Sequence, residues 1–501
     1  MEAEPMADRI DHAGAQRLLR LPLGIKLGYA AGQLLEGVIV NATNIFLLFY
    51  VTAVCGLSGW LAGIALAAGL IVDAVMDPII GSMSDGWRSH YGRRLPFMVA
   101  GLIPVILCFV GIFSLPVGLD QALLFAIVTA LSILLRVSLS LFILPYQAIG
   151  AELSDNYNER SGIMAWRWGV GYVGALIAVL LGFGVFFRGK TGLSRHGAYT
   201  PFALSLSIVV IVGALLAMRA VWATRDRHHP PVSVEGNFLL RVFGELVEVF
   251  RNRSFRILFI GALLFFLALS VHTALGLHAN TFFWHFTSGQ TQMVTLAIFS
   301  GLLFGAPLAG PFLARMEKRT VLVIGMTGLT VAQAGPTLLR LLGLFPWEGD
   351  MLALILSVIM LIGGALMAAA GIAFASMMAD AADEHEHLFG ARREGLYYAG
   401  WAFAVKASAG LGALVAGAVL SMIDFPTDLA AHGGTAAVLP ERMVDMLGLF
   451  YGPGAAVLSL AAVLSNLWYR LDSKAHAAIM TDLTERRRAT ANAASMVGQM
   501  V

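Results

Sequence analysis

Two aspartates, Asp73 and Asp77, lie four residues apart inside a strongly apolar stretch of the sequence. Four residues make about one turn of α-helix, so both side chains are expected on the same helix face. A single charge near the centre of a bilayer costs about 2.5–3.5 kcal/mol even on mild scales. Two carboxylates that repel one another there are suited to take up a proton or to supply oxygen ligands to a small hard cation. The pair is therefore predicted to bind H+ or Na+, and the alternative is an ion pair with an intramembrane Arg or Lys.

Charged residues in other apolar stretches also call for a partner or a ligand. Arg136 is predicted either to form a fixed salt bridge with the aspartate pair or with Glu36, or to bind an anionic group of a ligand. A guanidinium suits the second role because it can contact a carboxylate, sulfonate or phosphate with two parallel hydrogen bonds. Glu36 is a further candidate ligand-binding residue, and Arg167 and Lys406 are further charged residues within apolar spans. Their alternatives are a structural ion pair for Glu36 and an arginine that extends to the membrane surface for Arg167.

The stretches that carry these residues are apolar enough to cross a bilayer. Of the 501 residues, 58% are hydrophobic and 13% are charged, whereas soluble domains carry about 25% charged residues. A span of about 30 Å of hydrocarbon needs roughly 20 apolar residues. Twelve such spans are expected, near 24–51, 58–82, 96–115, 121–147, 162–187, 200–222, 255–283, 291–313, 320–343, 351–379, 396–421 and 443–469.

The distribution of basic residues predicts how these spans are oriented. If the N-terminus is cytoplasmic, 25 of the 33 Lys and Arg residues fall in inside segments, four fall in outside loops and four lie within spans. Cytoplasmic loops of membrane proteins are enriched in Lys and Arg. An even number of spans then places both termini in the cytoplasm.

The two halves of the chain resemble one another. A basic cluster follows both the second and the eighth span, and an acidic segment followed by Arg and Gly leaves both the fourth and the tenth. Parallel repeats of this kind predict a substrate cavity between two halves, near the midplane. The predicted organisation is a six-helix bundle at 1–222, a cytoplasmic linker at 223–254, a second six-helix bundle at 255–469 and a cytoplasmic tail at 470–501.

The loop after the second span contains Gly81, Asp85, Arg93 and Arg94 and resembles the loop motif of the major facilitator superfamily. More narrowly, the chain resembles the glycoside–pentoside–hexuronide:cation symporters, a branch that also includes lysolipid transporters. The matching segments occur in order over nearly the whole chain: Lys26–Tyr29, Asp73–Gly81, Gly92–Phe97, Leu144–Tyr146, Glu159 with Arg160 and Arg167, and Asp380 followed by Lys406.

The resemblance implies an all-α membrane protein with the major facilitator fold, in which twelve transmembrane helices form two pseudo-symmetric six-helix bundles. It implies symport of a small solute, a sugar or glycoside, by alternating access, with Asp73 and Asp77 as the coupling-ion site. The solute would contact Arg167 and Lys406 as in the family, and the expected contacts also include Glu36, Arg136 and Tyr146. Asp85, Arg93 and Arg94 are expected to act as a gating latch.

Two acids of the family pattern are replaced here. Ile143 stands where an acid precedes the Pro–aromatic pair, and Gly37 stands where an acid lies late in the first span. Fewer carboxylates favour coupling to H+ over Na+. Together with Arg136, the loss also supports an alternative solute that is anionic or amphiphilic, such as an acidic glycoside or a lysophospholipid.

Other motifs are predicted to be structural. The glycines at 169, 171 and 174 spell a dinucleotide fingerprint, but they lie in an apolar span with no preceding strand, which indicates a helix-packing face. The acidic and histidine residues at 383–387 are interpreted as a solvated cytoplasmic loop rather than a metal site. We therefore expect that the chain is not an enzyme and that it uses no cofactor. It is expected to be a monomer in a bacterial inner membrane, with the bilayer and a solute as partners and, at a net charge of +2, without nucleic acid.

Overall fold

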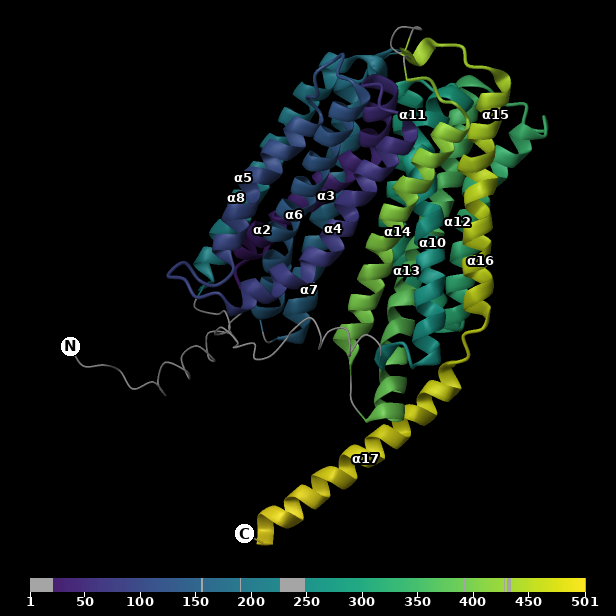
Figure 1. Cartoon of the computed structure of the whole chain (residues 1–501). Coiled ribbons are helices and arrows are strands. Elements are labelled where there is room, and N and C mark those ends of the chain that lie inside the picture. The colour runs from purple at the N-terminus through teal and green to yellow at the C-terminus, as the bar shows by residue number, and fades with distance from the viewer. Residues whose placement is uncertain are drawn as a thin grey trace. The chain divides into compact units, whose positions relative to one another are not determined.

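The computed structural model describes residues 21–154, 156–189, 191–225, 248–390, 393–427, 429 and 434–500. Throughout these residues the regular structure is helical, as the coiled ribbons of Figure 1 show. Twelve helices in the described part are long and apolar enough to cross a membrane, which confirms the predicted spans. Most of the predicted linker at 223–254 and the first 20 residues lie outside the described part.

The chain divides into two compact units. The described residues of unit 1 fall within 21–225, 273–296 and 410–447. Its regular elements begin with a first span built from four consecutive helical segments, of which the last two are π-helical. These elements are α2 (Leu23–Ala31), α3 (Gln33–Ala42), η1 (Thr43–Leu47), η2 (Tyr50–Val54), α4 (Gly59–Gly86), α5 (Leu95–Ile112), α6 (Gln121–Glu152), α7 (Tyr157–Leu181), η3 (Gly182–Phe186), η4 (Gly192–Ser194), η5 (His196–Ala198), α8 (Tyr199–Ala223), η7 (Ala279–Phe283) and η9 (Gly434–Ala436).

Unit 2 takes its described residues from 248–272, 297–409 and 448–500. Four helices have residues in both units: α10, α11, α14 and α15. The elements are α10 (Arg253–His278), α11 (Ser288–Arg315), α12 (Lys318–Leu341), α13 (Gly349–Phe389), α14 (Glu394–Met422), α15 (Glu441–Leu449), η10 (Phe450–Gly454), α16 (Ala455–Leu467) and α17 (Ser473–Met500). Part of the predicted C-terminal tail is therefore a helix.

The helix α13 corrects one expectation. It continues without a break to Phe389, ten residues past the predicted end of the span, and so includes the residues expected to form a solvated loop. Within this extension Asp383 is 8% exposed and His385 is fully buried. His476 on α17 lies 3.1 Å from the Asp383 carboxylate, and the two elements pack together. Contact with α17 therefore replaces solvent on this face of the helix.

Glycines set how closely the first and fifth spans of unit 1 approach. A Cβ on Gly37 would lie 2.3 Å from the Gly171 carbonyl oxygen, and a Cβ on Gly174 would lie 3.1 Å from the Gly37 backbone. Such distances are possible only because neither helix carries a side chain there. Gly171 and Gly174 confirm the predicted packing face, whereas a Cβ on Gly169 would meet no atom within 4 Å, so Gly169 is not part of it. The close contact of α3 with α7 fixes which face of α3 points toward α6.

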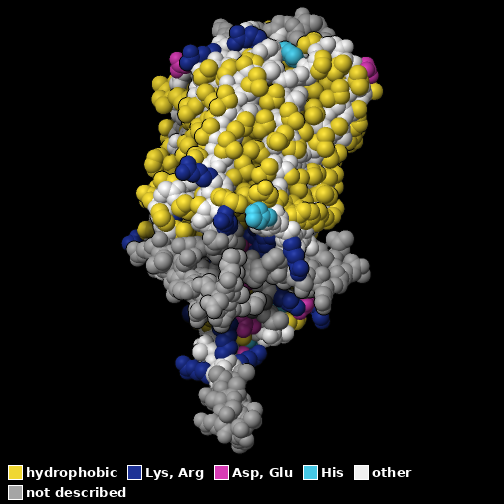
Figure 2. Space-filling model, turned by 90° about the vertical axis from the view of Figure 1, so that its left-hand side faces the viewer, with side chains coloured by type: hydrophobic (Ala, Val, Ile, Leu, Met, Phe, Trp, Pro, Cys, Tyr) yellow, Lys and Arg dark blue, Asp and Glu magenta, His cyan; other side chains and the backbone are white. Residues whose placement is uncertain are grey.

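Exposed apolar side chains recur about once per turn along the helices. On α5 they include Val99, Ile103 and Leu107, and on α8 they include Leu204, Ile208 and Val212. Figure 2 views the side of unit 1 where α5 and α8 lie, and hydrophobic side chains cover it while most Lys and Arg side chains lie toward its two ends. An apolar stripe on the outside of a helix that also packs on its inside is typical of helices surrounded by lipid.

Candidate functional site

The Asp73–Asp77 pair lies on α4 and faces α6. The two helices pack closely, and a Cβ on Gly69 would lie 3.0 Å from the Ser132 carbonyl oxygen. This approach brings the Ser140 hydroxyl of α6 to 2.5 Å from Asp73 Oδ1 and 2.7 Å from Asp77 Oδ1. Asp73 is only 3% exposed, whereas Asp77 is half-buried. The predicted pair is therefore joined by a third oxygen that the sequence analysis did not single out.

The two short contacts of Ser140 limit where hydrogen atoms can lie between the hydroxyl and the two carboxyl groups. Both O···O distances are those of hydroxyl–carboxylate hydrogen bonds. A serine hydroxyl has one hydrogen, so it can donate fully to only one of the two carboxylates. The second short contact is satisfied if the other carboxyl group is protonated and donates to Ser140 Oγ. The arrangement can thus hold one proton between two aspartates.

Arg136 lies on α6, one turn before Ser140. The charges that attract its guanidinium are, in decreasing order, those of Asp73, Glu36 and Asp77. The structure therefore brings together the predicted ion pair and two of the predicted solute residues. With all groups ionised, three carboxylates face one guanidinium, which leaves an excess of negative charge that a cation can balance. These charges attract the guanidinium, and both alternatives for Arg136, a fixed salt bridge and an anion-binding group, stay predictions.

Glu36 on α3 is held by two glutamines. Gln33 Nε2 donates to Glu36 Oε2 at 2.6 Å, and Gln147 Nε2 donates to the same oxygen at 3.2 Å. Gln33 comes from the same helix, one turn earlier, and Gln147 comes from α6. The sequence analysis missed both glutamines. The spacing of Gln33 and Glu36 was the one available signal, since the approach of α6 cannot be read from the sequence.

Tyr146 is fully buried and pairs with Tyr29 of α2. Each tyrosine hydroxyl donates to the backbone carbonyl oxygen of the other, at 3.0 and 2.9 Å, and the rings stack with centroids 4.8 Å apart. Gly32 makes room for this pair, because a Cβ there would lie 2.6 Å from the Tyr146 ring. The Tyr146 hydroxyl is thus engaged within the protein, and contact between Tyr146 and a solute stays a prediction.

Arg167 on α7 lies against this tyrosine pair. Its guanidinium is beside the Tyr29 hydroxyl and attracts that of Tyr146 as well. Its Nε atom and the Gln33 Oε1 atom are both buried and make no hydrogen bond to any described residue. A buried donor or acceptor without a partner costs about 1–3 kcal/mol. Arg167 and Gln33 therefore offer one donor and one acceptor that a polar ligand can satisfy.

The predicted latch residues form one ion-pair network. Arg94 lies 2.8 Å from Asp85 and 2.9 Å from Glu152, and Arg93 also pairs with Glu152. Both arginines are less than a tenth exposed. Glu152, at the end of α6, is the partner that the latch prediction lacked. The network links the loop after α4 to the end of α6.

Unit 2 carries an ion-pair network at the equivalent place of its own half. Lys318, at the start of α12, lies 2.6 Å from Asp380 on α13. His476 lies 3.6 Å from Asp380. The recurrence of basic and acidic segments in the sequence thus corresponds to ion pairs in both units. The remaining predicted solute residue, Lys406, lies on α14 within the part that belongs to unit 2.

Twelve apolar helices, together with a cluster of carboxylates, a guanidinium and amide groups on α3, α4 and α6 of unit 1, define a polytopic membrane protein with a polar site among the helices of unit 1. In the described residues, no group of three or more His, Cys, Asp or Glu side chains is placed to hold a metal ion.

A family model described as MFS/sugar transport protein matches residues 28–473, and the chain belongs to this family. It is therefore a transporter and not an enzyme. Along 95% of its length the chain is 23% identical to the putative glycoside/cation symporter YagG of Escherichia coli strain K12, and the alignment covers 98% of that protein. The chain is also 23% identical to a putative sulfoquinovose importer of Salmonella typhimurium, with 94% of each covered.

A solved structure shares the fold. The crystal structure of the nucleoside transporter NupG superposes with a TM-score of 0.55 over 89% of this chain and 99% of that one. Sequence identity is 15%, so the likeness concerns the fold alone. It confirms the predicted fold class, an all-α membrane protein of the major facilitator type.

Proposed function

We propose that the protein is a symporter that couples the movement of a sugar or glycoside to a cation bound at Asp73, Asp77 and Ser140. The observation that carries the proposal is the Ser140 hydroxyl, which lies within hydrogen-bond distance of both carboxylates. Membership of a sugar transport family and similarity to a putative glycoside/cation symporter support the same function.

The short contacts of Ser140 favour H+ as the coupling ion. One added proton supplies the hydrogen that the second contact needs and removes one of the excess negative charges beside Arg136. A hard metal cation would require more oxygen ligands than two carboxylates and one hydroxyl provide. Neutralising the cluster lowers the free-energy cost of moving the loaded site through an apolar barrier, which couples the cation to the solute.

The solute is proposed to bind at the polar groups next to this cluster. Glu36 and Gln147 supply hydrogen-bonding groups for hydroxyls, and Gln33 and Arg167 each supply an atom that has no partner among the described residues. We assign Lys406 to the same role in unit 2. Opening and closing of the Asp85–Arg94–Glu152 network is proposed to gate access from one side of the membrane.

The proposal is tested with purified protein in proteoliposomes. A ligand-stabilisation screen over neutral sugars, acidic sugars and lysolipids first identifies a solute, and uptake is then driven by a pH gradient or by a Na+ gradient. We expect uptake to follow the pH gradient and Ser140→Ala to weaken it more than tenfold. Ser132→Ala is the matched control, because Ser132 lies on the same helix and its buried hydroxyl has no partner among the described residues. Equal activity of the two variants contradicts the proposal.

A second candidate is transport of an anionic or amphiphilic solute, such as an acidic glycoside or a lysophospholipid. It is favoured by similarity to a putative sulfoquinovose importer and by the Nε atom of Arg167, which lacks a hydrogen-bond partner in the described part of the chain. The negative excess around Arg136 disfavours it. Stabilisation by acidic sugars that Arg167→Gln removes, with no stabilisation by neutral sugars, would establish this candidate in place of the first.

We further propose that the protein is a monomer in a bacterial inner membrane with both termini in the cytoplasm. The excess of Lys and Arg in the segments assigned to that side supports the orientation. Labelling of single cysteines introduced into the tail and into the loop at 188–195 with a membrane-impermeant reagent tests it, since only the loop should react from outside the cell.

A further inference from the structure

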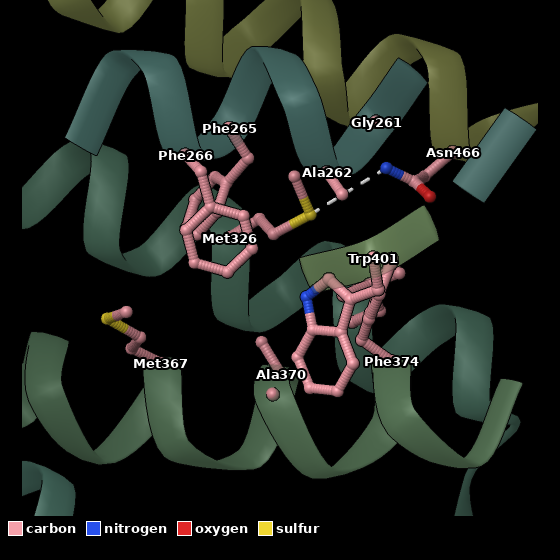
Figure 3. Close-up of a pocket in the computed structure, with 12 residues that line it drawn as sticks. Gly261, Ala262, Phe265, Phe266, Met326, Met367, Ala370, Phe374, Trp401 and Asn466 are labelled. Atoms are coloured by element: carbon pink, nitrogen blue, oxygen red, sulfur yellow. Dashed lines mark hydrogen bonds between the residues drawn. The ribbon is translucent and has the colours of Figure 1, made fainter. Parts of the chain in front are cut away.

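Two cavities among the described residues differ in size and in the chemistry of their walls. In unit 2, α10, α12, α13, α14 and α16 surround about 50 Å³. Gly371 lines this space, and a Cβ there would meet no atom within 4 Å. An apolar cavity that takes one benzene ring measures about 150 Å³, so the cavity of unit 2 is too small for a sugar ring. Figure 3 shows the side chains around it, which include Met326, Met367, Phe374 and Trp401.

The larger cavity lies in unit 1 and measures about 530 Å³. We call it the loop cavity, because its lining residues come from three segments that are far apart in the sequence, 187–194, 281–288 and 434–444. Binding sites for small molecules commonly measure about 300–1,000 Å³. The loop cavity is therefore large enough for a sugar or a glycoside.

Hydrogen bonds between the three segments fix the wall of the loop cavity. Ser288 Oγ donates to the Phe187 carbonyl oxygen and lies 3.2 Å from that of Gly189, which joins the second segment to the first. The Thr435 backbone N–H donates to Ser194 Oγ at 2.5 Å, which joins the third segment to the first. A wall that is already fixed loses little conformational entropy when a ligand binds, so the cavity is preorganised.

Part of this wall offers groups that bind hydroxyls. Glu441, at the start of α15, is exposed and supplies a carboxylate, and Thr287 and Thr435 supply hydroxyl groups. An ionised carboxylate accepts charge-assisted hydrogen bonds, and a threonine hydroxyl both donates and accepts. These are the groups that recognise a solute with several hydroxyls.

The rest of the wall is mainly apolar. It includes Leu193, Phe282, Phe286 and Val444, and both phenylalanines are less than a tenth exposed. A neutral sugar ring carries hydroxyls around its edge and C–H groups on its faces, so it can use both parts of the wall at once. A fully apolar solute would desolvate the Glu441 carboxylate without giving it a hydrogen bond.

His285 is a lining residue with an unfavourable backbone conformation. Its φ is 55°, in the left-handed region that is costly for a residue with a Cβ. Its two neighbours, Trp284 and Phe286, are buried and hold the turn, and its own side chain is exposed at the cavity. Residues held in such conformations cluster at ligand-binding sites.

We propose that the loop cavity is a binding site for a neutral sugar or glycoside, separate from the site at the carboxylate cluster. The Glu441 carboxylate and the His285 imidazole bind hydroxyls of the solute, and the apolar side chains contact the C–H face of its ring. In the proposed orientation the three segments lie outside the cell, so the solute binds here before it enters the transport path. This purpose rests on the proposed function, whereas binding itself requires neither an ion gradient nor the carboxylate cluster.

The test measures whether a sugar shields a cysteine placed in the loop cavity. Leu439→Cys introduces the thiol at a partly exposed lining position, in a chain that also carries Cys55→Ala and Cys108→Ala. Its rate of reaction with a maleimide is measured on the purified full chain in lipid nanodiscs, which contain no sugar headgroups. The probes are methyl β-D-glucopyranoside and tetrahydropyran-2-methanol, which keeps the ring but lacks three hydroxyls. We expect the glucoside to protect the thiol at concentrations at least about tenfold lower, the difference that two net hydrogen bonds supply.

Two variants test the assigned contacts. Glu441→Gln should raise the protecting concentration of the glucoside about three- to tenfold, because a charge-assisted hydrogen bond becomes a neutral one. Asp445→Asn is the matched control, since Asp445 is exposed on the same helix and does not line the cavity. His285→Gly should also weaken protection without lowering the melting temperature, because glycine adopts a positive φ without strain. Unchanged protection in both Glu441→Gln and His285→Gly overturns the proposal.

Further controls separate this site from the proposed transport site. Val117→Cys places a thiol at an exposed position that does not line the cavity, and the glucoside should not slow its reaction. Arg167→Gln should leave the protection of Leu439→Cys unchanged, since Arg167 lies beside the tyrosine pair of α2 and α6. Equal protection by both probes, equal protection of Val117→Cys, or loss of protection in Arg167→Gln overturns the proposal. Protection without gradient-driven uptake would contradict the proposed function alone, and uptake without protection would overturn the loop cavity alone.

Discussion

The carboxylate cluster of unit 1 and the cavity of unit 2 lie in helices of similar apolar composition but differ in chemistry. In unit 1, three carboxylates, one guanidinium and the Ser140 hydroxyl gather on α3, α4 and α6. In unit 2, the cavity wall has rings, thioethers and one indole N–H that no described residue accepts from. The properties of the first region should depend on charge, and those of the second should depend on the volume and shape of its side chains. Changes of charge and changes of volume should therefore affect different properties of the protein.

The difference also concerns stability. Burying charges is costly unless each is paired, and the one guanidinium of the unit 1 cluster compensates only part of the charge of its three carboxylates. An apolar cavity costs less, because its lining forfeits only dispersion contacts. Substitutions that break the balance of charge in unit 1 should thus have larger effects than substitutions around the unit 2 cavity.

The largest effect is expected at the aspartate pair. Asp73→Asn and Asp77→Asn remove the charge that a coupling ion balances, so gradient-driven uptake should fall at least about 100-fold. Exchange of labelled for unlabelled solute, which needs no net movement of the ion, should persist. Asp120→Asn is the control, because Asp120 caps α6 outside the cluster and asparagine can also cap. Uphill uptake at the normal rate by either aspartate variant contradicts the role of the pair.

The next effect concerns Arg136. Arg136→Gln removes the guanidinium that attracts three carboxylates and should lower the free energy of unfolding, because their mutual repulsion is then uncompensated. The measurement is the melting temperature of the purified protein at neutral pH.

A double variant tests whether uncompensated charge causes the loss of stability in Arg136→Gln. Adding Glu36→Gln to Arg136→Gln removes one uncompensated charge and should recover part of the stability, in a double-mutant cycle. Additive losses in the double variant would show that Glu36 and Arg136 do not interact.

A smaller effect should separate the ion-pair networks of the two units. Glu152 is 7% exposed and bridges two buried arginines, whereas Lys318 is 38% exposed on its side chain where it pairs with Asp380. Glu152→Gln should therefore lower the free energy of unfolding by up to about 3–5 kcal/mol, and Lys318→Gln should lower it by about 0–1 kcal/mol. Melting temperatures in low and high salt measure both, and the Lys318 pair should be the more sensitive to salt. Equal losses would show that solvent screens both networks alike.

The smallest effect is expected beside the cavity. Gly371→Ala adds a methyl group in open space and reduces the freedom of the unfolded chain, so it should stabilise the protein by about 0.5–1 kcal/mol. Gly301→Ala in the same unit is the contrast, because its Cβ would lie 2.1 Å from the Leu361 carbonyl oxygen. Thermal unfolding of the two variants should shift in opposite directions. A loss of stability in Gly371→Ala would show that the space is not open.

The sequence by itself determined the twelve spans and the shared face of Asp73 and Asp77. Backbone polar groups in lipid must be satisfied within a helix, so length and hydropathy suffice to locate the spans. The helical repeat then fixes which residues of one span share a face. The similar halves were also visible, because basic and acidic segments recur at equivalent positions in the sequence.

Only the tertiary structure decided which residues of different spans meet. Ser140 is one of several serines on α6, and it became part of the site because the approach of α4 to α6 sets the rotation of both helices. The same reason explains why Gln147 reaches Glu36 and why Tyr146 is buried against Tyr29. Helix rotation and depth depend on contacts between residues far apart in the sequence, such as Gly69 with Ser132 and Gly37 with Gly171, and no local pattern encodes them.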